Sequence, residues 1–277
     1  MALRINTNVN SVFAQKHVSR TQERMRSNME HLSSGLRITK AADDAAGLAV
    51  SEKMRSQIRS LRMAQRNAND GISMVQTAES GLAESTNILS RMRELAVESA
   101  SGVLQATERA YLATEFTALQ NEMERIADST QFNGLNLSDG STATVDVQVG
   151  IFNVAAEDRI TVTLQDSQTA TLAVDTGTID LASAANSQAA LTAIDTALDS
   201  VNDARADYGA VQNRMTSALH NLENYTENLV ESESRIRDVD FAMETADLTR
   251  NQVFQQAGVA ILAQANSSPQ AALSLLQ

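Results

Sequence analysis

Apolar residues recur at alternating intervals of three and four over the second half of the chain. This spacing places them on one face of an α-helix, and it predicts a helix about 70 Å long whose apolar face is covered by partner helices. A few polar residues interrupt the pattern without shifting it. The apolar positions are Leu191, Ile194, Leu198, Val201, Tyr208, Met215, Leu219, Leu222, Leu229 and Ile236.

The first half of the chain supplies two further helices that can cover this face. One apolar pattern runs up to Leu82, where its frame slips, and it resumes at Ile88. Its residues are Ile58, Leu61, Ala68, Ile72, Val75 and Leu82, followed by Ile88, Met92 and Leu95. After a break at Ser101-Gly102, a shorter helix is predicted from Leu112, Phe116, Leu119, Met123 and Ile126. Three helical segments can therefore share one bundle.

The middle of the chain changes to the alternation that is typical of β-strands. Val145, Val147 and Val149 alternate with polar residues, as do Ile160, Val162 and Leu164. We therefore predict a β-hairpin that turns across Gly150–Asp158. The segment Thr169–Ala185 is expected to be an irregular loop, with room for one more strand at Thr171–Val174.

Both ends of the chain are apolar and helical in pattern but contain few large side chains. Neither end can form a stable core alone, so we expect both to be mobile in the monomer and to become helical against partner molecules. The residues expected in this assembly core are Leu3, Ile5, Val9, Val12, Phe13, Val253, Phe254, Ile261, Leu262, Leu273 and Leu276.

Composition agrees with a mainly α protein. The 277 residues are 43% apolar but only 3% aromatic, and they include a single proline, so long uninterrupted helices are permitted. The predicted fold is an elongated antiparallel helical bundle or coiled coil, formed by the N- and C-terminal halves, with a small β-hairpin at the midpoint.

No apolar run reaches the ~18 residues of a membrane span, so membrane insertion is not expected. The first ten residues lack the features of a secretory signal, which leaves both a cytoplasmic location and export by a dedicated route open.

Charge is distributed unevenly along the chain. Residues 1–66 carry a net charge of +7, and the remainder carries −19. The two parts could attract each other within one chain or between chains. Nucleic-acid binding is not expected, because the arginines are spread along helical sequence without interleaved aromatic residues.

Catalytic, cofactor and metal motifs are missing from the sequence. The three histidines have no i, i+4 pair, and the absence of cysteine excludes thiol catalysis and cysteine-bound metal. Asp43-Asp44 is better explained as a helix start than as a catalytic pair. There is no nucleophile elbow, P-loop or dinucleotide fingerprint. We expect neither an enzyme nor a cofactor.

More specific are the short motifs that occur in order at both ends of the chain. In the first half they are residues 2–8, 32–38, 41–48, 67–72, 93–97 and 130–134; in the second half they are residues 234–238, 255–258, 262–266 and 273–276. In these motifs the chain resembles the bacterial flagellins. The resemblance covers nearly the whole chain except its middle, where the joining segment is too short for the outer domains of many flagellins.

The resemblance implies a structural subunit that polymerises into the flagellar filament for swimming motility. It implies export by the flagellar type III apparatus and an extracellular location. Terminal helices, residues 1–40 with 238–277, would form an inner layer, and residues 41–237 would form a helical bundle with a hairpin at about 143–164. The alternatives are a hook–filament junction protein, which has similar ends, and a cytoplasmic coiled-coil adaptor.

The resemblance also implies partners. These are further copies of the chain, a flagellin export chaperone, and hook-associated and cap proteins; other flagellins are an additional candidate. In this family the vertebrate toll-like receptor for flagellin recognises positions that match Arg91, Leu95 and Glu115. We expect Arg91 and Leu95 to share one helix face, with Glu115 beside them on the next helix.

Overall fold

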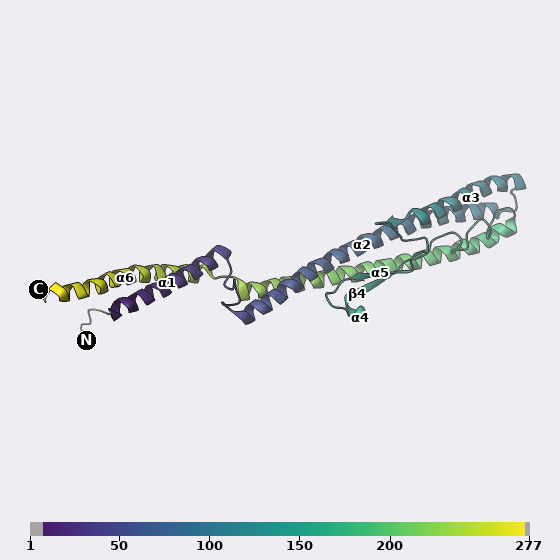
Figure 1. Ribbon diagram of the computed structural model, residues 1–277. Coiled ribbons are helices and arrows are strands. Elements are labelled where there is room, and N and C mark those ends of the chain that lie inside the picture. The colour runs from purple at the N-terminus through teal and green to yellow at the C-terminus, as the bar shows by residue number, and fades with distance from the viewer. Residues whose placement is uncertain (1–7, 275–277) are drawn as a thin grey trace. The chain divides into compact units, whose positions relative to one another are not determined.

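The computed structural model describes the backbone of residues 8–274 and the side chains of residues 8–267. The chain divides into two compact units (Figure 1). Unit 1 comprises Met1–Ile58 and Glu227–Gln277, and unit 2 comprises Arg59–Thr226. The long helices α2 (Ala45–Ser99) and α5 (Ala184–Arg237) each contribute residues to both units.

Unit 2 is built on three helices, as the apolar patterns predict. The third is α3 (Ala106–Ser129), which begins after the turn at residues 101–105 and lies beside α2 (Figure 1). Phe116 and Met123 of α3 are buried in the same core as the apolar residues of α2 and α5. The mainly α fold with long packed helices is confirmed.

The buried face of α2 follows a heptad pattern without any interruption. From Leu61 to Ser99 a continuous set of buried positions alternates in steps of three and four, so the frame slip expected after Leu82 is wrong; Met74 and Leu95, beside this set, are buried as well. Small side chains occupy many of these positions, while the larger Ile72 and Ile88 lie half-buried beside them. A search for large apolar residues therefore misses the true frame. The positions of this continuous set are Leu61, Ala64, Ala68, Gly71, Val75, Ala78, Leu82, Ser85, Leu89, Met92, Ala96 and Ser99.

Helix α5 repeats this arrangement. One row of its buried residues has the predicted seven-residue spacing: Ile194, Val201, Tyr208, Met215 and Leu222. The second row consists of Ala190, Ala197 and Ala204, whereas the predicted Leu191, Leu198 and Leu219 are only half-buried. Small residues bring the helices close together. A Cβ added at Gly71 would lie 3.1 Å from Met215 of α5 and from Val147 of the hairpin.

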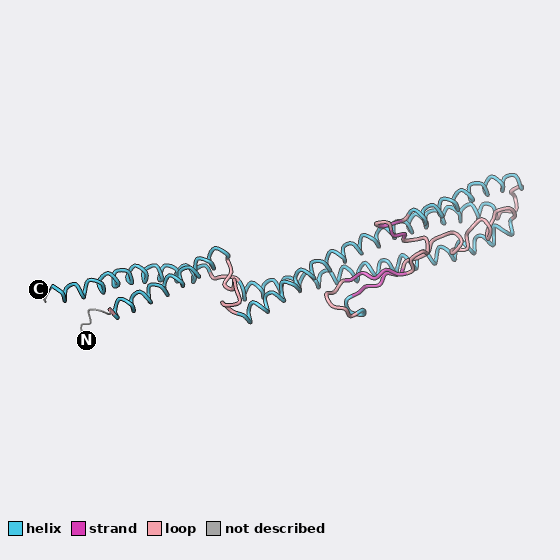
Figure 2. Tube along the Cα trace, viewed as in Figure 1, coloured by secondary structure: helices cyan, strands magenta, loops and turns pink. Residues whose placement is uncertain are grey.

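The predicted hairpin at the chain midpoint is confirmed. Strand β3 (Thr144–Gln148) pairs antiparallel with β4 (Arg159–Thr163), and Val147 lies opposite Ile160. The connection contains the short helix α4 (Ala155–Asp158). Figure 2 shows both strands of this hairpin in magenta.

A second, smaller hairpin was not predicted. Strands β1 (Gln131–Phe132) and β2 (Leu135–Asn136) are joined by Asn133 and Gly134, whose φ angles are 50° and 80°. Positive φ at both central residues is the requirement of a type I′ turn, for which Asn-Gly is the preferred dipeptide. This Asn-Gly dipeptide is the feature of the sequence from which the second hairpin could have been predicted.

The segment before α5 is irregular, as expected, but it contains no strand at residues 171–174, and residues 171–173 form a turn instead. Its apolar side chains, Leu172, Val174, Ile179 and Leu181, are buried in the core of unit 2. Two helices hold its backbone: Gln120 Nε2 donates to the Val174 carbonyl at 2.8 Å, and Ser99 Oγ donates to the Leu181 carbonyl at 3.2 Å. The segment is thus a packed part of unit 2.

Candidate assembly surface

The terminal helices of unit 1 form an antiparallel pair. Helix α1 (Val9–Ser34) lies beside α6 (Phe241–Ser274) (Figures 1 and 2). The start of α1 meets the end of α6, where Asn8 Nδ2 donates to the Ala265 carbonyl at 2.8 Å. At the other end Asn28 Nδ2 donates to Glu244 Oε1 at 2.6 Å.

Local sequence fixes the ends of α1. Asn8 caps its first turn, because its side-chain oxygen accepts from the Ser11 backbone N–H at 3.1 Å. Gly35 ends it in the left-handed conformation, with φ of 71°, and its N–H donates to the His31 carbonyl. The chain then turns back along the end of α5, where the Val239 N–H donates to the Gly35 carbonyl.

The turn between α1 and α2 is held by two aspartates. Asp43 accepts from the backbone N–H groups of Thr39 and Lys40 and from the Thr39 hydroxyl. Burial alone would raise the pKa of Asp43, but these hydrogen bonds outweigh it and lower the pKa. Asp44 caps α2 by accepting from the Gly47 N–H at 2.9 Å. The prediction of a helix start at Asp43-Asp44 is confirmed.

The helix pair has almost no core of its own. In the described side chains of α1 and α6, the buried residues are Asn28 and Asn251, each 9% exposed. Asn251 Nδ2 donates to Asn28 Oδ1 at 2.9 Å. Large apolar side chains of both helices instead remain exposed.

Most residues predicted for the assembly core belong to this exposed set. Their exposed fractions are 49% for Val9, 61% for Val12, 61% for Phe13, 56% for Val253, 54% for Phe254 and 61% for Ile261. Leu262 is half-buried. Leu3, Ile5 and Leu276 lie outside the described residues, and the side chain of Leu273 is likewise not described.

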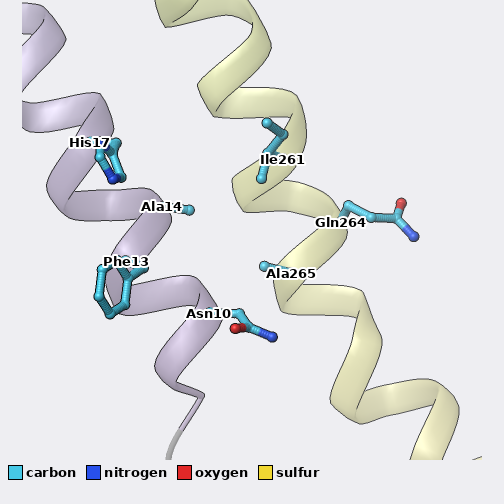
Figure 3. A pocket seen from close by; sticks show the side chains of 7 residues that line it. All are labelled: Asn10, Phe13, Ala14, His17, Ile261, Gln264 and Ala265. Atoms are coloured by element: carbon cyan, nitrogen blue, oxygen red, sulfur yellow. The ribbon is translucent and has the colours of Figure 1, made fainter. Parts of the chain in front are cut away.

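A groove of about 580 Å³ opens between the two helices where several of these residues gather. It is lined by Asn10, Phe13, Ala14, His17, Ile261, Gln264 and Ala265. Figure 3 shows Ala14 and Ala265 directed into the space between the helices, while Phe13 and His17 lie one turn apart on α1. Such a groove can receive apolar side chains of another molecule.

The second predicted site, in unit 2, is assembled only in part. Arg91 donates to Glu115 of α3 through Nη2 at 2.7 Å and to Glu94 through Nη1 at 2.8 Å. Hydrogen bonds to Glu94 and Glu115 raise the pKa of the Arg91 guanidinium. Leu95, however, is 1% exposed and lies in the core, so the expected shared face of Arg91 and Leu95 is not observed.

The described part of the chain holds no cluster of histidine, cysteine, aspartate or glutamate that could bind a metal. None of its helices is long and apolar enough to cross a membrane.

Comparison with known proteins places both halves of the chain in one family. Residues 5–143 match the bacterial flagellin N-terminal helical region, and residues 191–276 match the bacterial flagellin C-terminal helical region.

Known flagellar proteins also match this chain over nearly their whole length. The chain is 45% identical to a flagellin of Halalkalibacterium halodurans over 99% of both chains. It is 43% identical to the flagellar filament 33 kDa core protein of Treponema phagedenis, also over 99% of both. It is 40% identical to a flagellin of Bacillus subtilis over 99% of this chain and all of the relative.

Among solved structures, the Bacillus cereus flagellin is 34% identical with a TM-score of 0.50, covering 57% of this chain and 88% of that one. The long paired helices, the exposed apolar ends, the two family matches and the full-length relatives therefore agree: this chain belongs to the bacterial flagellin family.

Proposed function

We propose that this flagellin polymerises through the exposed apolar face of the α1–α6 pair. The chain is a structural subunit of the extracellular flagellar filament and not an enzyme. The observation that carries the proposal is the inverted burial of this pair, which buries two asparagines and exposes its phenylalanines and most of its valines. Burying one such apolar side chain is worth about 1.5–3 kcal/mol, so contacts between subunits gain what the single chain lacks.

A charge placed on this face tests the proposal. Phe13→Asp should prevent polymerisation, because a carboxylate cannot be buried without a partner. Val103 is also exposed, at 89%, but it lies outside the helix pair, so Val103→Asp is the matched control. Electron microscopy after seeding with filament fragments measures elongation. Normal elongation by Phe13→Asp would contradict the proposal, and seeds that the native protein cannot elongate would favour a junction protein.

We also propose that the terminal helices become ordered on assembly. Their pair lacks an apolar core that could offset the entropy of ordering. Hydrogen exchange at residues 253–262 should be fast in the monomer and slow in the filament. Strong protection already in the monomer would contradict this part of the proposal.

The layers of the filament are part of the same proposal. Residues 1–40 with 238–277 would form the inner layer, and residues 41–237, with the hairpin at about 143–164, the layer around it. The turn from Gly35 to Asp44 and the break between α5 and α6 lie at these boundaries and support them.

Further proposed partners are an export chaperone at the C-terminal helix, the hook-associated and cap proteins, other flagellins, and the type III apparatus as the export route. Deletion of residues 271–277 should weaken chaperone binding and leave the thermal unfolding of unit 2 unchanged. A loss of helical signal throughout the chain would show that the deletion acts on folding instead.

For the vertebrate toll-like receptor, the ion pair of Arg91 with Glu115 supports recognition of this face of unit 2. Both side chains are about half exposed and join two helices. Leu95 would contribute by holding α2 in place, since it is buried. Monomer should activate a receptor reporter, and intact filament should not.

A further inference from the structure

Three arginines on the outer face of α2 have no carboxylate partner among the described residues. Arg59, Arg62 and Arg66 are all exposed and are spaced so that they share one helix face. We call them the basic row. Met63 lies within this row and is 47% exposed. Arginine and methionine are enriched in protein interfaces, so this composition is typical of a contact surface.

Helix α5 carries the complementary charge. Asp199, Asp203 and Asp207 follow one another at intervals of four residues, are exposed, and have no ion pair in the described part of the chain. We call them the acidic row. Like charges at this spacing repel each other along a helix. Cations from another molecule would relieve that repulsion.

The two rows cannot meet within one subunit. The pairs Arg93–Asp195 and Gln65–Thr226 show which positions of the antiparallel helices α2 and α5 lie level with each other. By that register Arg62 lies level with a point about 24 residues from Asp203, so the two are separated along the helices by about 36 Å, at 1.5 Å per residue. Each row nevertheless extends about 10 Å, so their lengths match.

We infer that the basic row of one subunit binds the acidic row of a second copy of the same chain, displaced by about 36 Å along the helix direction. This inference rests on the proposed polymerisation and adds to it a contact within unit 2. Because the two rows are different surfaces, the contact leaves one row free at each end of any assembly. A contact of this kind continues into an open filament.

Cysteine cross-linking tests the contact directly, because the native chain contains no cysteine. In the variant Arg62→Cys with Asp203→Cys, the two thiols of one subunit are too far apart for a disulfide, which needs Cβ atoms about 4 Å apart. Oxidised filaments should therefore give a ladder of covalent multimers on a denaturing gel. Arg125→Cys with Asp203→Cys is the control and should give none, since Arg125 lies on α3.

Two results of this experiment would overturn the inference. Filaments that form but do not cross-link would show that the rows do not meet. Dimers without higher multimers would show a closed pair of copies instead of an open contact. If the native protein fails to polymerise, the proposed function fails, and that outcome is visible before any variant is made.

Charge reversal gives an independent measure. Arg62→Glu and Asp203→Lys should each raise the critical concentration for polymerisation by about tenfold, because like charges then face each other. The double variant should return close to the native value, since it restores opposite charges. Arg125→Glu, an exposed charge outside both rows, should change little. Native-like polymerisation of both single variants would contradict the contact.

Discussion

Asn251 donates its side-chain amide to the Asn28 side-chain oxygen at 2.9 Å, and these two asparagines are the buried residues among the described side chains of the terminal helix pair. A polar pair in a helix interface commonly fixes register at some cost in stability. Asn28 also donates to Glu244, so it links two partners on α6. The alignment of the pair thus depends on hydrogen bonds more than on apolar packing.

Asn28→Ala should weaken the filament, because it leaves the Asn251 amide without its partner in a buried position. An unsatisfied buried group costs about 1–3 kcal/mol, which should lower the temperature at which filaments dissociate. Gln22→Ala, at an exposed position of the same helix, is the control. Equal dissociation temperatures for the two variants would show that the asparagine pair contributes no stability.

The same substitution at two helical glycines should have opposite effects. A Cβ at Gly209 meets nothing within 4 Å, so Gly209→Ala should stabilise α5 by about 0.5–1 kcal/mol. Gly71→Ala should destabilise, because its Cβ would be crowded by Met215 and Val147. Chemical denaturation of the monomer measures both, and similar shifts in midpoint would contradict the close packing at Gly71.

Substitutions at Arg91 and Leu95 should separate receptor recognition from folding. Arg91→Ala should reduce receptor signalling without changing thermal unfolding, because exposed ion pairs contribute little to stability. Leu95→Ala should lower stability by about 2–5 kcal/mol, since it opens a cavity in the core. A receptor reporter assay measures signalling, and calorimetry measures folding stability. Undiminished signalling by Arg91→Ala would show that the family's receptor positions do not carry over to this chain.

Insertions in the segment before α5 should be tolerated only at its exposed point. A short insert between Thr176 and Gly177, which are exposed, should leave the unfolding temperature unchanged. An insert after Val174 or before Leu181 should unfold unit 2, because both side chains are buried and both carbonyls accept hydrogen bonds from helices. Equal tolerance at all three positions would contradict the packed structure of this segment.

Alkaline pH should reveal the environment of Tyr208. Burial raises the pKa of its phenol, although a hydrogen bond from the Gln165 backbone N–H acts in the opposite direction. The unfolded chain therefore loses this proton first, and stability should fall as pH rises above about 10, the pKa of an unperturbed tyrosine. Tyr208→Phe should reduce this fall, whereas Tyr111→Phe should not, because Tyr111 is 78% exposed. If the stability of both variants fell equally with rising pH, the fall could not be assigned to Tyr208.

The sequence predicted what depends on local pattern and could not predict what depends on packing. The hairpin at β3 and β4 was predicted correctly, because alternation of apolar and polar residues is a local signal. The unbroken face of α2 was missed, because Gly71 and Ser85 are buried there for their small size and not for their hydrophobicity.

The same difference applies to the candidate sites. The exposed apolar residues of α1 and α6 could be recognised as a face without a core. The burial of Leu95 could not be predicted from the sequence. Arg91, its neighbour in the receptor motif, is half exposed, and only the three-dimensional packing makes the exposure of these two residues differ.

The unbroken seven-residue spacing from Leu61 to Ser99 has a consequence for the shape of unit 2. A straight α-helix drifts by about 20° per heptad against such a spacing, so α2 must wind around its partners in a left-handed supercoil. Over the length of this segment the winding amounts to roughly 100°. Side chains seven residues apart on the outside of α2 therefore follow a left-handed helical path. A neighbouring subunit that packs along this path can move along α2 only if it also rotates around it. The axial displacement of a subunit is thus coupled to its angular position.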